Sequence, residues 1–213
     1  MNGLMEETFL YWTLNGETQA PFLCSSGDEK QLLTGHMLAS GLTEKPDEII
    51  LSQGTDGIWH VSSSKCSRAG TLPERLDKLP PLLTDLSVPL KDVEALQGRV
   101  MELDHGSGLH AILLWDGEKQ VIGRDIGRHN AVEKAVGKAL AAGMRLDRTV
   151  LCCSGRLSLE MLAKAAFSGI PVAATRKQVG TLCAAYADKL HMAVCHLGSS
   201  VETFGAAWRV TTE

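Results

Sequence analysis

The second half of the chain alternates short apolar runs with amphipathic stretches, and the two patterns follow each other regularly. Two apolar runs flank a polar turn at 116–119, and the run at 149–154 has no polar face, which is typical of a strand buried on both sides. The predicted strands are residues 109–115, 120–126, 149–154, 170–175 and 191–198. The predicted helices between them are residues 130–140, 157–169 and 179–190. This alternation predicts an α/β fold with a mixed, mainly parallel sheet and helices on its faces.

The first half of the chain is less regular. An Asn15-Gly16 pair between two apolar stretches predicts a β-hairpin, because both residue types tolerate the positive φ angles of a tight hairpin turn. Residues 25–41 predict a helix with Ser26 as its N-cap and Gly41 at its end.

Further along the first half, residues 48–62 predict two strands around a glycine-rich turn. The turn residues of 63–71 predict an exposed, mobile loop. Residues 72–98 predict short helices interrupted by prolines. We therefore divide the chain into a smaller α+β part, residues 1–104, and a ligand-binding α/β part, residues 105–213.

The composition is that of a globular chain, with 44% hydrophobic and 22% charged residues in a total of 213. No segment approaches the roughly 20 consecutive apolar residues of a transmembrane helix, so no membrane association is expected. The first 12 residues lack the basic region of a secretion signal. A net charge of −4 argues against nucleic-acid binding. Six cysteines without disulfide or metal-site spacing favour a reduced, cytoplasmic setting.

Polar clusters follow several predicted strands, at the edge where open parallel sheets bind ligands. Two clusters also lead into helix N-termini, whose free N–H groups attract anions, and Arg128 and Arg156 add guanidinium groups suited to phosphate. We therefore predict a pocket for a phosphate-bearing ligand. The alternative is that the same residues are helix caps and surface ion pairs. The predicted pocket residues are Asp125, Gly127, Arg128, His129, Asn130, Ser154, Gly155 and Arg156.

Individual side chains near this edge have two interpretations. Asp125 is either a group that orients Arg128 or His129, or a plain helix cap. His110 begins a strand, where it either faces the pocket or fills a structural role. Glu133 is expected, with its neighbour Lys134, on the exposed face of its helix.

Cys66 is the one cysteine in the predicted mobile loop. It lies between Lys65 and Arg68, and nearby cations lower a thiol pKa and favour the reactive thiolate. The alternative is an incidental exposed cysteine. The other cysteines lie in strand or helix patterns, where packing explains them; they are Cys24, Cys152, Cys153, Cys183 and Cys195.

Several of these segments resemble the FdhD/NarQ family of formate dehydrogenase accessory sulfurtransferases. The resemblance rests on Gly-Ser-Gly-Leu-His-Ala at 106–111, on Arg-Asp-Ile-Gly-Arg-His-Asn-Ala at 124–131 and on Ser-Gly-Arg-Leu-Ser at 154–158. Residues 21–49 and the closing stretch 197–210 are also similar, so that the resemblance covers most of the chain.

The resemblance implies a three-layer α/β/α fold like that of cytidine deaminases, and a homodimer. It implies that sulfur moves from a cysteine desulfurase, through a persulfide on Cys66, to a molybdenum (or tungsten) bis-guanine-dinucleotide cofactor bound for apo-formate dehydrogenase. A guanine nucleotide would then be a surrogate ligand. Zinc is not expected, because the ligand motifs of zinc deaminases, His-x-Glu and Pro-Cys-x-x-Cys, are missing from the sequence.

The chain departs from the family pattern at two places. Ala69 stands where the loop typically has a second cysteine, and residues 201–205 replace a C-terminal aromatic motif that touches the cofactor. The resemblance assigns cofactor contacts there to Glu202, Thr203 and Phe204. The departures leave two alternatives open: a chaperone that binds the molybdenum cofactor without moving sulfur, or a divergent protein with another nucleotide ligand.

Overall fold

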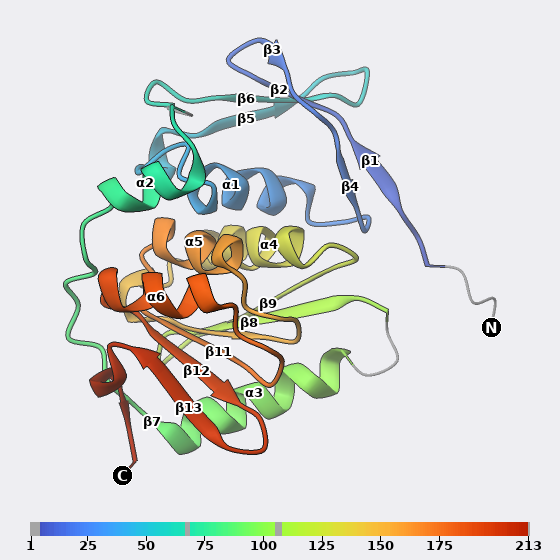
Figure 1. Ribbon diagram of the computed structural model, residues 1–213. Coiled ribbons are helices and arrows are strands. Elements are labelled where there is room, and N and C mark those ends of the chain that lie inside the picture. Colours follow the sequence, from blue (N-terminus) through green and yellow to red (C-terminus); the bar gives the residue numbers. More distant parts are fainter. Residues whose placement is uncertain (1–4, 67–68, 105–107, 213) are drawn as a thin grey trace.

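The computed structural model describes residues 5–66, 69–104 and 108–212. Its centre is a six-stranded sheet with the strand order β13-β12-β11-β10-β8-β9 (Figure 1). These strands are β8 (His110–Trp115), β9 (Gln120–Asp125), β10 (Val150–Cys153), β11 (Val172–Thr175), β12 (Ala193–Leu197) and β13 (Val201–Gly205). The central β10, β11 and β12 pair in parallel, whereas β8, β9 and β13 join in antiparallel pairs. The expected α/β class and mixed sheet are confirmed.

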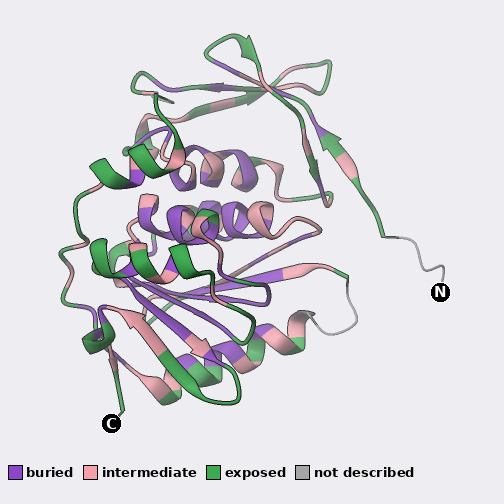
Figure 2. Ribbon diagram, in the orientation of Figure 1, coloured by how far each residue is buried: buried purple, intermediate pink, exposed green. Residues whose placement is uncertain are grey.

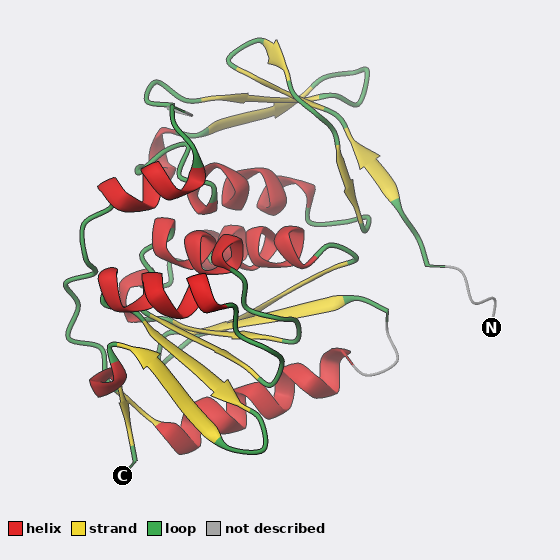
Figure 3. Ribbon diagram, in the orientation of Figure 1, coloured by secondary structure: helices red, strands yellow, loops and turns green. Residues whose placement is uncertain are grey.

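Helices cover both faces of this sheet (Figures 1 and 3). On one face lie α4 (Arg128–Ala141), α5 (Leu159–Phe167) and α6 (Thr181–Lys189), each following a strand, as right-handed crossovers require. The opposite face carries α3 (Leu90–Asp104). Although α3 belongs to residues 1–104 in the sequence-based division, it packs on the central sheet, where Gln97 Nε2 donates to the Cys153 carbonyl at 2.9 Å.

The remaining N-terminal residues form further layers above α4 and α5. Helix α1 (Glu29–Ala39) lies against α4, and a small sheet with the order β3-β2-β6-β5 covers its other side. The strands of this sheet are β2 (Trp12–Leu14), β3 (Glu17–Thr18), β5 (Ile50–Gln53) and β6 (Trp59–Ser62). The other elements are β1 (Thr8–Leu10), β4 (Phe22–Cys24), α2 (Leu72–Lys78), β7 (Val88–Pro89), β14 (Val210–Thr211) and short 3-10 turns at Pro46–Glu48, Leu146–Arg148 and Ala207–Arg209.

Side-chain alternation along the strands produces two cores, one on each side of the central sheet. The strands of this sheet are largely buried, as Figure 2 shows. In β8, Ile112 and Leu114 face the layer of α4–α6, whereas Ala111 and Leu113 face α3. A third core lies between α1 and the small N-terminal sheet. In the part of the chain that the structure describes, no helix is long and apolar enough to cross a membrane.

Several local predictions are confirmed, and others are wrong. The Asn15-Gly16 turn has φ angles of 50° and 85° and joins β2 to β3, as predicted. Ser26 is not the N-cap of α1, because Asp28 occupies that position with a left-handed φ of 64°. Residues 72–98 were expected to hold only short helices, but α3 runs for 15 residues to Asp104. The sequence analysis also missed β13.

Candidate functional site

The predicted ligand edge exists as a geometric feature. Strands β9 to β12 run in one direction, since β8 pairs antiparallel with both β9 and β10, so their carboxyl ends meet at one edge of the sheet. The antiparallel β8 begins there, with His110 paired to Asp125, and a Cβ built on Gly155 would lie 3.4 Å from His110 Nδ1. The topology thus brings His110 and the two polar clusters at 125–130 and 154–156 together.

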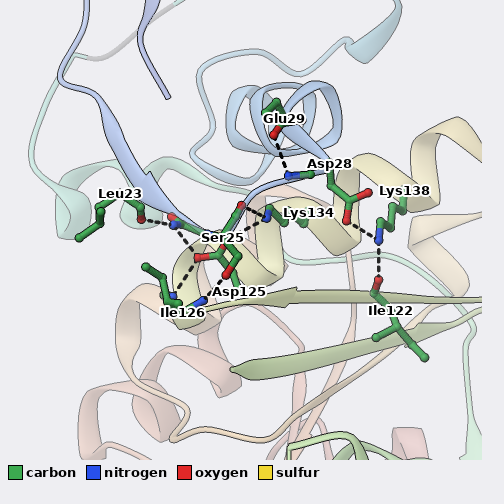
Figure 4. A network of polar contacts seen from close by, with 12 residues as sticks. Leu23, Ser25, Asp28, Glu29, Ile122, Asp125, Ile126, Lys134 and Lys138 are labelled. Atoms are coloured by element: carbon green, nitrogen blue, oxygen red, sulfur yellow. Dashed lines mark hydrogen bonds and ion pairs between the residues drawn. The ribbon is translucent and has the colours of Figure 1, made fainter. Parts of the chain in front are cut away.

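Asp125 organises this edge from inside the protein (Figure 4). Its side chain is completely buried, and Oδ2 lies 2.8 Å from Lys134 Nζ and accepts from the Ser25 amide at 3.1 Å. Oδ1 accepts from the Gly127 amide and from Asn130 Nδ2, both at 2.9 Å. These contacts show Asp125 fixing the turn that starts α4, with its oxygens directed at protein groups.

The same network ties the N-terminal part to α4. Asn130 Nδ2 also donates to the Leu23 carbonyl at 2.8 Å, and Lys134 Nζ donates to the Ser25 carbonyl at the same distance. The expectation that Glu133 and Lys134 form an exposed helix face is wrong, because they are only 2% and 1% exposed. Their helix face is covered by α1, which the helical period of α4 alone does not reveal.

The two predicted phosphate-binding arginines have no polar partner in the part of the chain that the structure describes. Arg128 is half-buried and Arg156 is exposed, and neither guanidinium has a hydrogen bond or ion pair to any of the described residues. Each precedes or begins a helix at its N-terminus, where N–H groups favour anions. Both remain available to a ligand.

Ser154 and Gly155 are held by neighbouring strands. Ser154 Oγ accepts from the Ala111 amide at 3.0 Å, and the Gly155 carbonyl accepts from Thr175 Oγ1 at 2.7 Å. The Gly155 amide donates to Cys153 Sγ at 3.2 Å. These bonds fix the path of the chain between β10 and α5 and so position Arg156.

The C-terminal candidates lie on β13, the edge strand of the sheet. Glu202 is exposed, and its Oε2 lies 3.4 Å from His196 Nδ1. Thr203 Oγ1 lies 3.9 Å from Cys195 Sγ, and Phe204 packs against the core under α6. Of these three side chains, Glu202 is the most open to solvent.

A pocket between α1, α2, α4 and α5, with both polar and apolar lining residues, was not predicted from the sequence. Its volume is about 370 Å³, and His129 and Asn130 are the only predicted site residues among the described residues that line it. The buried Glu133 carboxylate lies at its floor, 2.8 Å from His36 Nδ1 and 2.5 Å from Lys164 Nζ. Burial alone would raise the pKa of Glu133, but these two neighbours outweigh it and hold the pKa at about 2.

His129 stands at the rim of this pocket, with Nε2 3.1 Å from Glu160 Oε2. Burial, together with the positive charge of Lys164, lowers the pKa of His129, so its ring is neutral at physiological pH. Glu133 and His129 lie on α4, His36 lies on α1 and Lys164 lies on α5. Because three separate helices contribute these groups, no single sequence motif indicates the cluster.

Cys66 lies in a different layer from the carboxyl edge. It follows β6, is half-buried against the N-terminal core, and lines a cavity of about 360 Å³ with residues 41–45 and 64–65. Lys65 Nζ lies 3.9 Å from Glu48 Oε1, so this cation is partly compensated. Arg68 and part of the predicted mobile loop lie outside the described residues.

The other described cysteines are poor nucleophiles. Burial raises the pKa of Cys24 and of Cys195 to about 11, and that of Cys183 to about 12. Burial also raises the pKa of Cys152. All five cysteines other than Cys66 are buried, so Cys66 is the cysteine that is most accessible to a reagent from solvent.

Comparison with protein families identifies the chain. The model of the FdhD/NarQ family matches residues 5–204, which is nearly the whole sequence. The chain belongs to the FdhD/NarQ family. Among relatives in that family, the sulfur carrier protein FdhD of Streptomyces avermitilis is 30% identical over 80% of this chain and 75% of its own length. FdhD of Streptomyces coelicolor is 38% identical over 67% of this chain, but this match spans only 49% of the relative.

The same fold is found in a solved crystal structure. A crystal structure from Desulfotalea psychrophila, assigned as a formate dehydrogenase accessory protein, matches with a TM-score of 0.80 over 97% of this chain and 90% of the other. With 23% sequence identity, this likeness supports the fold and not the chemistry. The FdhD/NarQ assignment therefore rests on the sequence, and the fold agrees with it.

Proposed function

We propose that this FdhD/NarQ protein is a sulfur carrier in the maturation of formate dehydrogenase. In this proposal Cys66 accepts sulfur from a cysteine desulfurase and carries it to a molybdenum bis-guanine-dinucleotide cofactor, which is cargo for the apo-enzyme. The observation that carries the proposal is that Cys66 is the one cysteine of this FdhD/NarQ chain that is not buried. We place the protein in the cytoplasm as a homodimer, as the family resemblance implies.

The first chemical step needs only one thiolate. The Cys66 thiolate attacks the terminal sulfur of a persulfide on the desulfurase, forming a new S–S bond while the old one breaks. The desulfurase cysteine leaves as a thiolate, and Cys66 becomes the persulfide. Because no second cysteine takes part, Ala69 does not prevent this step.

The carboxyl edge of the central sheet is where we place the phosphates of the cargo. Arg128 begins α4 and Arg156 lies shortly before α5, and neither has an ion pair among the described residues; the helix N–H groups nearby add to their attraction for phosphate. Since Cys66 lies in another layer, sulfur delivery requires either a movement of its loop or a route through the protein.

Persulfide formation tests the proposal directly. The protein is incubated with a cysteine desulfurase and cysteine, and its intact mass is measured. We expect an added mass of one sulfur in the unchanged protein and in Cys183→Ala, whose thiol is buried, and no addition in Cys66→Ser. Equal labelling of the Cys66→Ser variant would contradict the assignment.

The exposed Ala69 favours a second candidate function, a chaperone that binds the molybdenum cofactor without transferring sulfur. The two functions can be distinguished by complementation of a strain that lacks its own accessory protein, with formate dehydrogenase activity as the measurement. If Cys66→Ala restores formate dehydrogenase activity as fully as the unchanged chain, the chaperone function is correct. If only the unchanged chain restores it, the sulfur carrier is correct.

A further inference from the structure

A second hollow adjoins the cavity that Cys66 lines. Its volume is about 380 Å³, and Ser64 lines both hollows. Glu48 lies at the boundary between them, because its Oε2 accepts from Ser64 Oγ at 3.1 Å and its Oε1 lies 3.5 Å from Lys45 Nζ. The surface is therefore hollowed all the way from the outer edge of the small N-terminal sheet to the Cys66 thiol.

Ser63 gives this second hollow a polar group without a partner. The residue lines the hollow and is 6% exposed, and its Oγ has no hydrogen-bond partner among residues 5–66, 69–104 and 108–212. Its backbone is fixed, because its amide donates to Asn15 Oδ1 at 3.0 Å and its carbonyl accepts from Asn15 Nδ2 at 3.1 Å. The hydroxyl still rotates between staggered positions, so it can turn toward an N–H or C=O group that enters the hollow.

The second hollow also borders the edge strand of the small sheet (Figure 1). Strand β5 has β6 as its single strand partner in the part of the chain that the structure describes, and an edge strand is a template for pairing with another chain. Ile50, the first residue of β5, lines the hollow and is 68% exposed. An edge strand, an exposed apolar side chain and an unsatisfied hydroxyl are the features by which a sheet edge binds an extended peptide.

We propose that the surface formed by Ile50 and Ser62–Ser64 docks the segment of the desulfurase that carries its persulfide, bound as an extended peptide. The inference rests on the proposed function, because the donor sulfur must come within bonding distance of Cys66 Sγ. The residues beside the donor cysteine then lie on the surface that borders this thiol, which is the hollowed one. Ile50 packs against an apolar side chain of the segment, Ser63 Oγ bonds one of its backbone groups, and the sulfur chemistry stays with Cys66.

Sulfur loading of the complete protein from two donors tests the inference. A desulfurase supplied with cysteine presents sulfur on a peptide segment, whereas inorganic polysulfide presents it without one. Persulfide on Cys66 is followed by mass spectrometry over a range of donor concentrations. We expect Ile50→Asp to raise the desulfurase concentration that gives the half-maximal rate by about tenfold, and Ser63→Ala to raise it by about threefold or more. Loading from polysulfide should be unchanged in both variants.

A control and a second measurement separate docking from folding. Leu83→Asp is the control, because Leu83 is also an exposed apolar residue but lies on the connection between α2 and α3; it should load like the unchanged chain from both donors. Thermal unfolding of Ser63→Ala is the second measurement. The hydroxyl that this variant loses has no partner among the described residues, so the variant should be at least as stable as the unchanged chain although it loads more weakly from the desulfurase.

Three results would overturn the docking surface. Half-maximal desulfurase concentrations equal to that of the unchanged chain in both variants would leave Cys66 as the acceptor but remove the surface. Slower loading from both donors would mean that the substitutions act on the thiol itself. Conversion of a dimer to a monomer by Ile50→Asp, seen by light scattering, would assign the surface to a second copy of the chain. Failure of the proposed function is distinct, because the unchanged chain would then gain no sulfur from the desulfurase.

Discussion

At the scale of single residues, the Glu133 carboxylate is a buried charge that depends on its neighbours for stabilisation. It is fully buried, and Lys164 and His36 hold it in the ionised form. We expect Lys164→Met to cost about 3–5 kcal/mol of unfolding free energy, because it strips a buried charge of its partner. Urea denaturation measures the loss. Lys189→Met, which breaks the exposed pair with Asp77, should cost less than about 1 kcal/mol, and a similar loss in both variants would contradict this reasoning.

The same carboxylate predicts a pH dependence of stability. Its pKa falls from an ordinary value of 4.5 to about 2 on folding, so the unfolded chain binds the proton more tightly than the folded one. The resulting stabilisation is present above about pH 4.5 and is lost as the pH falls toward 2. Urea unfolding at several pH values should show this loss. The Glu133→Gln variant should lose less stability across that window, and parallel curves would show that other groups dominate.

Sequence reasoning at this scale singled out Cys66, which is the half-buried cysteine of the structure, and the polar turn at 125–130, but not the pocket floor. Cys66 and residues 125–130 were visible because a loop cysteine and a polar cluster at a strand end are local signals. Glu133 and Lys134 were assigned to an exposed face because the hydrophobic period of a helix does not reveal which other elements pack against it. Their burial depends on α1, which is about 100 residues away in the sequence.

At the scale of elements, the contact between α1 and α4 depends on two glycines. A Cβ built on Gly35 would lie 1.8 Å from the Glu133 carbonyl oxygen, and one built on Gly137 would lie 2.0 Å from the Gln31 carbonyl oxygen. The two helix backbones therefore touch, and no side chain fits between them. We expect Gly35→Ala and Gly137→Ala each to destabilise the protein by about 1–3 kcal/mol, as overpacking does.

A third glycine supplies the control for this prediction. Gly98 lies within α3, where an added Cβ meets nothing within 4 Å. Gly98→Ala should leave stability unchanged or raise it by up to about 1 kcal/mol, because alanine is the better helix former. Thermal unfolding measures the stability of all three variants. If the backbone contact between α1 and α4 is unimportant, Gly35→Ala and Gly137→Ala will be no less stable than Gly98→Ala.

Helices and strands were predicted well where the local sequence has a clear apolar period, and poorly where tertiary packing determines the secondary structure. The strands and helices from residue 109 to 198 follow clear apolar periods, and the structure contains them. Strand β13 was missed because its side chains are all exposed or half-buried and give no alternation. The full length of α3 was missed because nearby prolines suggested breaks, although Pro89 lies just before the helix starts.

At the scale of the whole molecule, Arg209 joins the C-terminal end of the chain to the connection between α2 and α3. It is 1% exposed and donates to the carbonyls of Leu82, Thr84 and Leu86 in the connection between α2 and α3, and to the His191 carbonyl before β12. Because this connection carries the chain from the outer helical layer across to α3, the guanidinium fixes how the N-terminal half wraps the central sheet (Figure 1).

Replacement of Arg209 by lysine should loosen this connection. A lysine ammonium has three donors on a flexible stem and cannot reproduce the planar fork, so some of the buried carbonyls lose their partner. We expect Arg209→Lys to cost about 2–4 kcal/mol and to speed amide hydrogen exchange in residues 82–92 more than in β10 and β11. The matched control is Arg148→Lys, because Arg148 contacts the same connection through Asp85 from the exposed surface and should change little. Uniformly faster exchange in Arg209→Lys would mean that the arginine stabilises the whole fold. Faster exchange confined to residues 82–92 would show that it stabilises the connection between α2 and α3.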